Sequence, residues 1–141
     1  MACGLRSLFV GFETLDPQNL RAQRKFQNLH RDYVAAIRRL HNLGVMVNGS
    51  FVFGMDDDDP SVFARTVEWA VRHGVETATF HVLTPYPGTA LHARMEAQGR
   101  ILTRDWDQYD TRHAVFTPAR MSGAELEDGY WRAYRDFYRW G

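Results

Sequence analysis

Residues 45–54, VMVNGSFVFG, decide the fold of this chain. Their β-branched and aromatic side chains are typical of a buried strand, and a glycine ends the run. Helical patterns flank this stretch over residues 33–43 and 63–71, and a second strand-like run follows over residues 77–83. The order of strand, helix and strand predicts an α/β fold with a parallel sheet, in which ligands bind at the carboxyl ends of the strands.

The strand period divides residues 47–54 into two faces. One face is apolar, whereas the other carries Asn48 and Ser50 together with Val52. A strand that is buried on both sides is almost continuously apolar, so the polar pair predicts a face turned toward a polar space, such as a barrel lumen with a ligand or water. An alternative of equal weight is that both side chains bond to neighbouring strands or to water.

A first strand is predicted over residues 7–12, with Glu13 at its carboxyl end. Residues 14–29 are polar and irregular, with one short helix starting near Pro17. The first strand is apolar on both faces, and such a strand at the edge of a sheet pairs with another segment. Three βα units are too few to close a barrel of about eight strands, so we expect a partial barrel that is completed from elsewhere.

The alternation of strand and helix ends near residue 100. Residues 101–118 are predicted to form an aromatic and polar loop or a short extended piece, and residues 122–140 to form an amphipathic helix with a capping box at Ser122 and Glu125. We therefore divide the chain into residues 1–100, which hold the βα units, and a C-terminal helical extension over residues 101–141.

Composition excludes several classes of function. Seventeen basic residues balance seventeen acidic ones, so no nucleic acid and no anionic membrane is expected as a partner. The longest apolar run is far shorter than the ~20 residues that span a bilayer, and we expect a cytoplasmic protein without a membrane span. Cys3 is the single cysteine; it cannot form an internal disulfide, and we expect a buried structural thiol.

Two clusters of ionisable residues each have two interpretations. The four aspartates at residues 56–59 either bind a cation or form a solvated turn before a helix, and we favour the turn, with the helix opening at Asp59 and Pro60. Asp110, Arg112 and His113 either close over a substrate as an acid and base set or form an ordinary ion-paired loop.

The serial order of the segments resembles the carboxyl half of a radical S-adenosylmethionine (SAM) enzyme core. The run SLFVGFETLDPQNL begins at residue 7, and DYVAAIRRLHNLGVMVNGSFVFG begins at residue 32. The similarity is to the branch shared by cobalamin-binding and methylthiotransferase-like members, and residues 101–138 resemble the C-terminal extension of the cobalamin type. The resemblance implies a partial (β/α)6 barrel, of which this chain holds the fourth, fifth and sixth strands.

This resemblance implies a parent enzyme with SAM and a [4Fe–4S] cluster, which cleaves SAM to a 5′-deoxyadenosyl radical and methylates or rearranges a small-molecule substrate; it leaves the use of cobalamin open. The cluster-binding triplet CxxxCxxC of the family is absent here. We therefore expect that the chain alone holds no metal and is inactive, and that its partner is the N-terminal half of the barrel, from the same gene or a separate chain. The alternative is a non-catalytic half barrel that serves as an interaction module.

The resemblance also implies which residues surround SAM. A carboxylate at Glu13 is placed to accept hydrogen bonds from the ribose hydroxyls or the amino group. The match to the fifth-strand motif GxIxGxxE is loose, because Ser50 replaces its first glycine and Asp57 stands at the acidic position. A lone strand histidine such as His81 is more often a satisfied lumen residue than a ligand. The residues expected to bind SAM are Glu13, Ser50, Val52, Gly54, Leu83, Thr84 and Tyr86, and those expected near a substrate are Asn48, His81, Asp110, Arg112 and His113.

Overall fold

A three-stranded parallel sheet forms the centre of the protein. The computed structural model describes residues 4–22, 24 and 32–139. The strands β1 (Ser7–Glu13), β2 (Met46–Phe53) and β3 (Thr77–Val82) lie in sequence order across the sheet. The predicted α/β class and the parallel sheet are therefore confirmed, and the described sheet is open.

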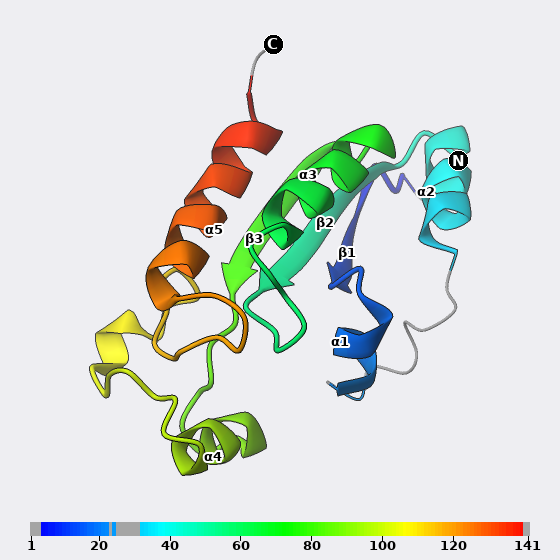
Figure 1. Cartoon of the computed structure of the whole chain (residues 1–141). Helices are drawn as coiled ribbons and strands as arrows, with labels where there is room; N and C mark the ends of the chain where they lie inside the picture. The colour runs from blue at the N-terminus through cyan, green and yellow to red at the C-terminus, as the bar shows by residue number, and fades with distance from the viewer. Residues whose placement is uncertain (1–3, 23, 25–31, 140–141) are drawn as a thin grey trace.

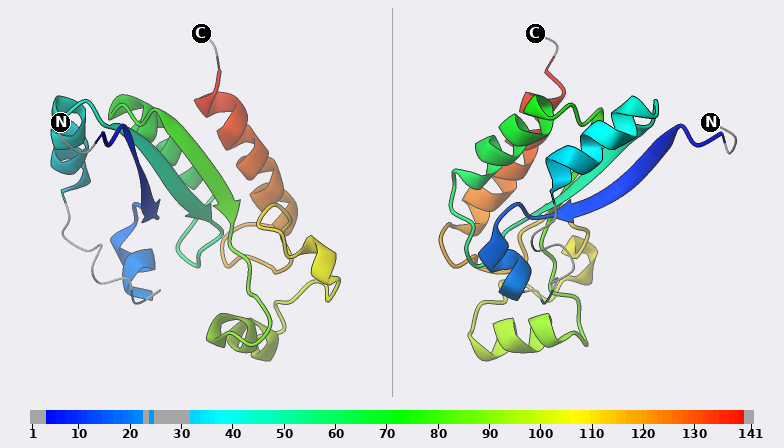
Figure 2. Two further views of the ribbon diagram at one scale, coloured as in Figure 1. Left: turned by 180° about the vertical axis from the view of Figure 1, so that it is seen from behind. Right: turned by 90° about the vertical axis from the view of Figure 1, so that its right-hand side faces the viewer.

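The helices occupy two places relative to the sheet. Helices α2 (Tyr33–Asn42), α3 (Val62–Arg72) and α5 (Gly123–Phe137) cover one face, whereas the short helices α1 (Pro17–Ala22) and α4 (Ala90–Ala97) lie beyond the carboxyl ends of the strands (Figure 1). A single 3-10 turn, Trp106–Gln108, lies in the loop between α4 and α5. The opposite face of the sheet carries no helix among the described residues (Figure 2). None of the helices in residues 4–22 and 32–139 is long and apolar enough to cross a bilayer.

A row of phenylalanines on the helix-covered face forms the centre of the core. The rings of Phe12 and Phe51 stack with centroids 5.4 Å apart, and Phe80 stacks on Phe51 at 5.8 Å and on Phe53 at 5.5 Å. All four side chains are about 1% exposed, because strand alternation brings them to the same face. Gly49 leaves room for this row, since a Cβ atom there would lie 3.0 Å from the Phe51 ring.

Helix α5 closes the outer edge of β3. The Tyr134 hydroxyl accepts a hydrogen bond from the amide of Phe80 at 3.0 Å and donates to its carbonyl at 3.2 Å. Tyr138 makes the same pair of bonds to Ala78, at 3.0 and 2.8 Å. The amide of Val82 donates to the carbonyl of Thr111 at 2.7 Å. The backbone groups that would pair with a further strand are therefore already satisfied at this edge.

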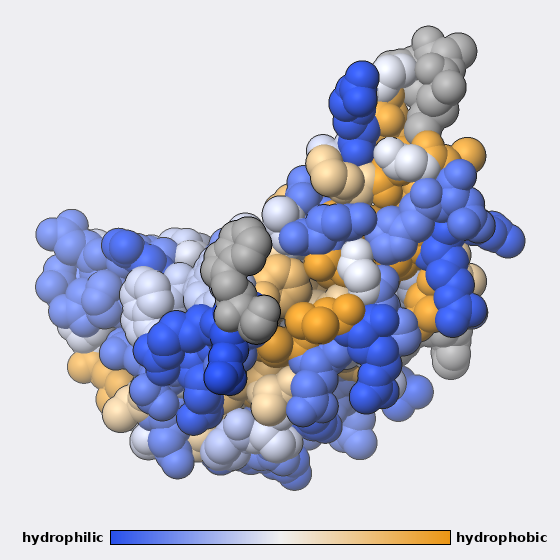
Figure 3. Space-filling model, turned by 90° about the horizontal axis from the view of Figure 1, so that it is seen from above, coloured by the Kyte–Doolittle hydropathy of each residue, from blue (hydrophilic) through white to orange (hydrophobic). Residues whose placement is uncertain are grey.

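The edge of β1 has no such cover among the described residues. Because the amide of Met46 donates to the carbonyl of Arg6 at 2.9 Å, alternation turns the backbone groups of Phe9 and Gly11 away from β2. The side chains of Leu8 and Phe9 are 39% and 65% exposed. Seen from the amino ends of the strands, hydrophobic surface continues along this projecting strand (Figure 3). The prediction of an apolar edge strand is therefore confirmed.

Two helix starts test the sequence predictions. Helix α5 begins with the predicted capping box: the Ser122 hydroxyl accepts from the Glu125 amide at 3.1 Å, and Glu125 accepts from the Ser122 amide at 2.7 Å. The predicted start of α3 at Asp59 is wrong, because the Asp59 carboxylate accepts from the amide and hydroxyl of Ser61 in a local turn, and the helix begins at Val62. The prediction for Cys3 and part of that for residues 14–29 lie outside the described residues.

Candidate functional site

Glu13 ends β1 in an unusual conformation. Its φ of 64° lies in the left-handed region, and the register with β2 shifts between Gly11 and Glu13. Non-glycine residues rarely adopt this conformation, and such strain clusters at ligand sites. The Glu13 Oε1 atom lies 3.0 Å from the point where a Cβ atom of Gly11 would stand, so the carboxylate folds back over Gly11. By its register Gly11 faces the uncovered side of the sheet, and it thus makes room for the acid there.

The uncovered face brings together several of the predicted site residues. Gly11 pairs in register with Ser50, and Ser50 pairs with Thr79. One step closer to the carboxyl end, Val52 pairs with His81. Because paired residues point to the same side of a sheet, this face presents a carboxylate, hydroxyls, an imidazole and a small apolar surface.

Asn48 and His81 each have a partner on this face. The Asn48 side-chain oxygen accepts a hydrogen bond from the hydroxyl of Thr77, so Asn48 bonds to the neighbouring strand, as one of the two interpretations of its polarity proposed. The imidazole of His81 lies 3.4 Å from the hydroxyl of Thr111. Thr111 has a φ of 65°, and sequence reasoning missed it because no spacing or residue pattern links it to β3.

Four predicted SAM contacts follow β2 and β3, and most of them point into the protein. A Cβ atom on Gly54 would lie 2.9 Å from Leu126 and 3.2 Å from Phe116, and the φ of Gly54 is 102°. Packing in the core therefore accounts for this glycine without a ligand. Leu83 packs against the core, and the Thr84 hydroxyl donates to the carbonyl of Val82 at 3.0 Å. Tyr86 is 46% exposed on the following turn.

The residues Asp110, Arg112 and His113 form a closed turn. The Asp110 carboxylate accepts hydrogen bonds from the amides of Arg112 and His113 and from both of their side chains, at 2.9 to 3.2 Å. Burial alone would raise the pKa of Asp110, but these hydrogen bonds outweigh burial and hold the pKa well below its usual range. Asp110 is thus an ionised anchor that holds Thr111 beside β3, and the geometry matches the ion-paired loop rather than a general acid.

Asp58 is buried beneath the tip of β2. Its carboxylate accepts hydrogen bonds from the amides of Gly54 and Met55, at 2.9 and 3.0 Å, and from the Asn19 side chain of α1 at 2.8 Å. Burial raises the pKa of Asp58 from 3.8 to about 6, although these three hydrogen bonds lower it. The prediction of a solvated aspartate turn is therefore wrong for Asp58, which is 1% exposed and joins α1 to the strand tip.

This buried carboxyl predicts an unusual pH dependence. Because the pKa of Asp58 is higher in the folded chain, its stabilising effect is complete below pH 3.8 and is lost as the pH rises to about 6. The stability advantage of wild type over Asp58→Asn, measured by urea unfolding, should be about 2–3 kcal/mol larger near pH 4 than near pH 7. Parallel curves of stability against pH for wild type and Asp58→Asn would contradict the assignment.

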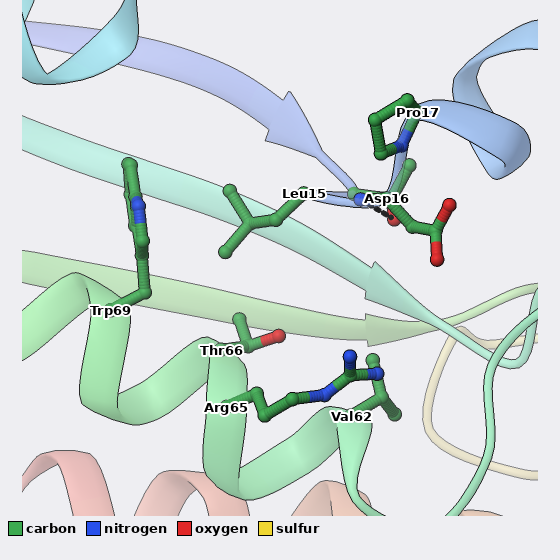
Figure 4. A pocket seen from close by; sticks show the side chains of 8 residues that line it. Leu15, Asp16, Pro17, Val62, Arg65, Thr66 and Trp69 are labelled. Atoms are coloured by element: carbon green, nitrogen blue, oxygen red, sulfur yellow. Dashed lines mark hydrogen bonds between the residues drawn. The ribbon is translucent and has the colours of Figure 1, made fainter.

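A separate cavity of about 290 Å³ lies between the loop after β1 and helix α3. Figure 4 shows Trp69 of α3 at one end of the cavity and Leu15 beside it, with Arg65 from α3 and Asp16 from the loop toward the other end. It lies on the helix-covered side of the sheet, because its lining residue Trp69 packs edge-on against Phe12 and Phe51. We therefore place the candidate site on the uncovered face, at the carboxyl ends of the strands.

The described residues include no group of three histidine, cysteine, aspartate or glutamate residues placed to hold a metal ion. The polar groups on the uncovered face are carboxylate and hydroxyl oxygen atoms and one imidazole. These groups can form hydrogen bonds with the hydroxyl, amino and ring groups of an organic ligand. The site therefore fits part of a pocket for a polar organic molecule.

Comparison with known proteins relates the chain to methyltransferases. The chain is 33% identical over 136 residues to the bacteriochlorophyllide d C-12(1)-methyltransferase of Chlorobaculum tepidum, a match that covers 96% of this chain and 29% of that enzyme. An uncharacterized methyltransferase of Pyrococcus horikoshii is 26% identical, with the same coverage of 96% and 29%. The hopanoid C-2 methylase of Rhodopseudomonas palustris is 27% identical over 70% of this chain and 19% of that protein. No protein-family model matches the chain.

The relationship extends over nearly the whole chain, but the chain spans less than a third of the length of these relatives.

Proposed function

We propose that this chain forms the carboxyl part of a radical SAM methyltransferase, in which its uncovered sheet face is one wall of the SAM and substrate pocket. The observation that carries the proposal is the similarity to a methyltransferase over 96% of this chain, together with a strained glutamate at the carboxyl end of β1. Because the relatives named above are a methylase and methyltransferases, they favour methylation over rearrangement. We include cobalamin as a methyl carrier in the proposal on the resemblance of residues 101–138 to the cobalamin type alone.

The residues of the site fit SAM but not an iron–sulfur cluster. Glu13 would accept hydrogen bonds from the ribose hydroxyls or the amino group, and Ser50 and Val52 would lie along the adenosine. Three cysteine ligands cannot come from a chain with one cysteine, so the cluster belongs to the remainder of the barrel. SAM supplies the methyl group or the radical when it is bound. The proposed role of this chain is to bind SAM and orient it.

The remainder of the barrel is proposed to join at β1. That edge is apolar and open among the described residues, whereas the edge of β3 is closed by Tyr134 and Tyr138. The complementary half comes either from the same polypeptide or from a separate chain. A half barrel without catalytic function is the competing proposal, and SAM binding distinguishes the two.

The role of Glu13 gives a direct test of SAM binding. We expect calorimetry to show SAM binding when the chain is mixed with an N-terminal half that has been reconstituted anaerobically with iron and sulfide. Glu13→Gln keeps the size of the side chain and removes its charge, and should weaken binding about tenfold, because a hydrogen bond to a charged group contributes about 1.5–3 kcal/mol.

Glu68→Gln is the matched control, because Glu68 is exposed on α3, on the covered side of the sheet. Equal affinities for both variants would remove Glu13 from the site. Absence of SAM binding in a mixture of folded halves would favour the non-catalytic half barrel.

A further inference from the structure

A second pocket lies beyond the carboxyl ends of the strands, between the end of α1 and helix α4. Its volume is about 340 Å³, and five residues line it: Ala22, Arg24, Ala90, Leu91 and Arg94. Two of them are arginines, and no described lining residue is acidic. Both helices lie beyond the carboxyl ends of the strands, at the end of the sheet where the candidate site is placed (Figure 2).

The donors of these two arginines are not used within the described part of the chain. The nearest carboxylate to Arg94 is Asp56, whose Oδ2 atom lies 3.7 Å from Arg94 Nη2, beyond hydrogen-bonding distance. Arg100 holds the same carboxylate at 2.9 Å, so Asp56 is already neutralised. Among the described residues, neither Arg24 nor Arg94 donates a side-chain hydrogen bond.

Arg100, by contrast, makes several hydrogen bonds within the protein. Its guanidinium donates to the carbonyl of Thr117 at 2.8 Å and to the Gln98 side chain at 3.1 Å, in addition to Asp56. Its side chain is 16% exposed, whereas that of Arg94 is 43% exposed. Arg94 thus keeps donors available to the pocket.

The charge and shape of the pocket match an anion. Asp56 is shared between Arg94 and Arg100, so one carboxylate does not offset the charge of both arginines, and Arg24 adds a further positive charge beside the alanine and leucine wall. Electrostatic attraction next to such an apolar surface is stronger than in open water. The planar fork of arginine is suited to two-point binding of a carboxylate or a phosphate. None of the described lining residues carries a carboxylate that would compete with a bound anion for these arginines.

We propose that the Arg24–Arg94 pocket binds an anionic group, a carboxylate or a phosphate, of the methyl acceptor. The anion site itself rests on the pocket alone, whereas its assignment to the acceptor rests on the proposed function. The pocket would anchor the charged end of the acceptor beyond the strand tips and leave its reacting part over the uncovered face.

The anion site is tested on the full chain by NMR of the arginine Nε–Hε groups. Inorganic phosphate and glutarate are titrated separately, with ionic strength held constant by sodium chloride. The signals of Arg24 and Arg94 should shift and saturate, and Arg94→Gln should weaken binding about tenfold. Arg72→Gln, an exposed change at the far end of α3, should leave the affinity unchanged. Shifts that do not saturate, or that are equal at Arg72, would overturn the anion site.

The source of the anion is tested in the mixture with the N-terminal half. Phosphate affinity that is unchanged by SAM supports the acceptor, whereas loss of phosphate binding upon SAM addition would assign the pocket to the SAM carboxylate and overturn the acceptor assignment. Saturable phosphate binding in a protein that does not bind SAM would refute the proposed function while the anion site stands.

Discussion

Replacement of Gly129 by alanine should destabilise the protein by about 3 kcal/mol, although alanine is the better helix former by about 1 kcal/mol. Gly129 lies in the middle of α5, where the helix packs directly on Phe63 of α3. A Cβ atom there would lie 2.2 to 2.4 Å from three atoms of the Phe63 ring. The ring cannot easily move, because it is 1% exposed and lies edge-on against Phe53, with centroids 4.8 Å apart.

The matched control is Gly123→Ala in the first turn of the same helix. A Cβ atom at that position would meet its nearest neighbours at 3.4 and 3.5 Å, which is ordinary van der Waals contact. Urea unfolding should therefore show unchanged or slightly increased stability for Gly123→Ala and a much lower midpoint for Gly129→Ala. Equal stabilities would show that α5 does not pack on Phe63 as described.

The second large effect is expected at the closed edge of β3. The double variant Tyr134→Phe/Tyr138→Phe removes two hydroxyls that together satisfy the amide and carbonyl of both Ala78 and Phe80. Loss of these partners should lower the free energy of unfolding by about 2–4 kcal/mol, because unsatisfied backbone groups remain at a partly buried edge.

Tyr86→Phe serves as the control for this pair, since Tyr86 is 46% exposed and its hydroxyl makes no hydrogen bond to the described residues. The double variant should also self-associate more at high concentration, as measured by sedimentation, because its β3 edge can then pair with another chain. A double variant as stable and as monomeric as Tyr86→Phe would refute the capping role of these hydroxyls.

Much of the fold could be predicted from periodicity alone. The strand of residues 45–54 has an apolar face because its side chains alternate, and this face became the phenylalanine row of the core. Helix α5 was predictable in the same way, because Ser122 and Glu125 stand three residues apart at its start. Both patterns depend on residues close together in the sequence, and such local preferences are realised in the folded protein when they are compatible with the packing of the core.

The interactions that the sequence did not predict join distant segments. Asp58 looked like one of four solvated aspartates, but Asn19, which is 39 residues away, and two backbone amides stabilise it in the interior. Residues 122–140 were predicted only as an amphipathic helix, whereas the hydroxyls of Tyr134 and Tyr138 bond to a strand 54 to 60 residues away. No spacing rule relates such partners, because they meet only when the tertiary fold forms.

The candidate site was predictable in part. Alternation along β2 indicated that Ser50 and Val52 share a face, and parallel pairing added His81 from β3. The bulge after Gly11, which turns Glu13 back over the sheet, has no sequence signal beyond the glycine itself. The position of Gly54 against Leu126 depends on where α5 packs, which is a tertiary property.

Amide hydrogen exchange can show whether β1 pairs with a strand of the N-terminal half and so completes the proposed methyltransferase pocket. The exchange of the chain alone is compared with that of the chain mixed with the reconstituted N-terminal half. We expect the outward amides of Phe9 and Gly11 to become strongly protected in the mixture, while those of Ala78 and Phe80, already bonded to tyrosine hydroxyls, change little. Unchanged exchange at β1, or new protection confined to β3, would contradict the account.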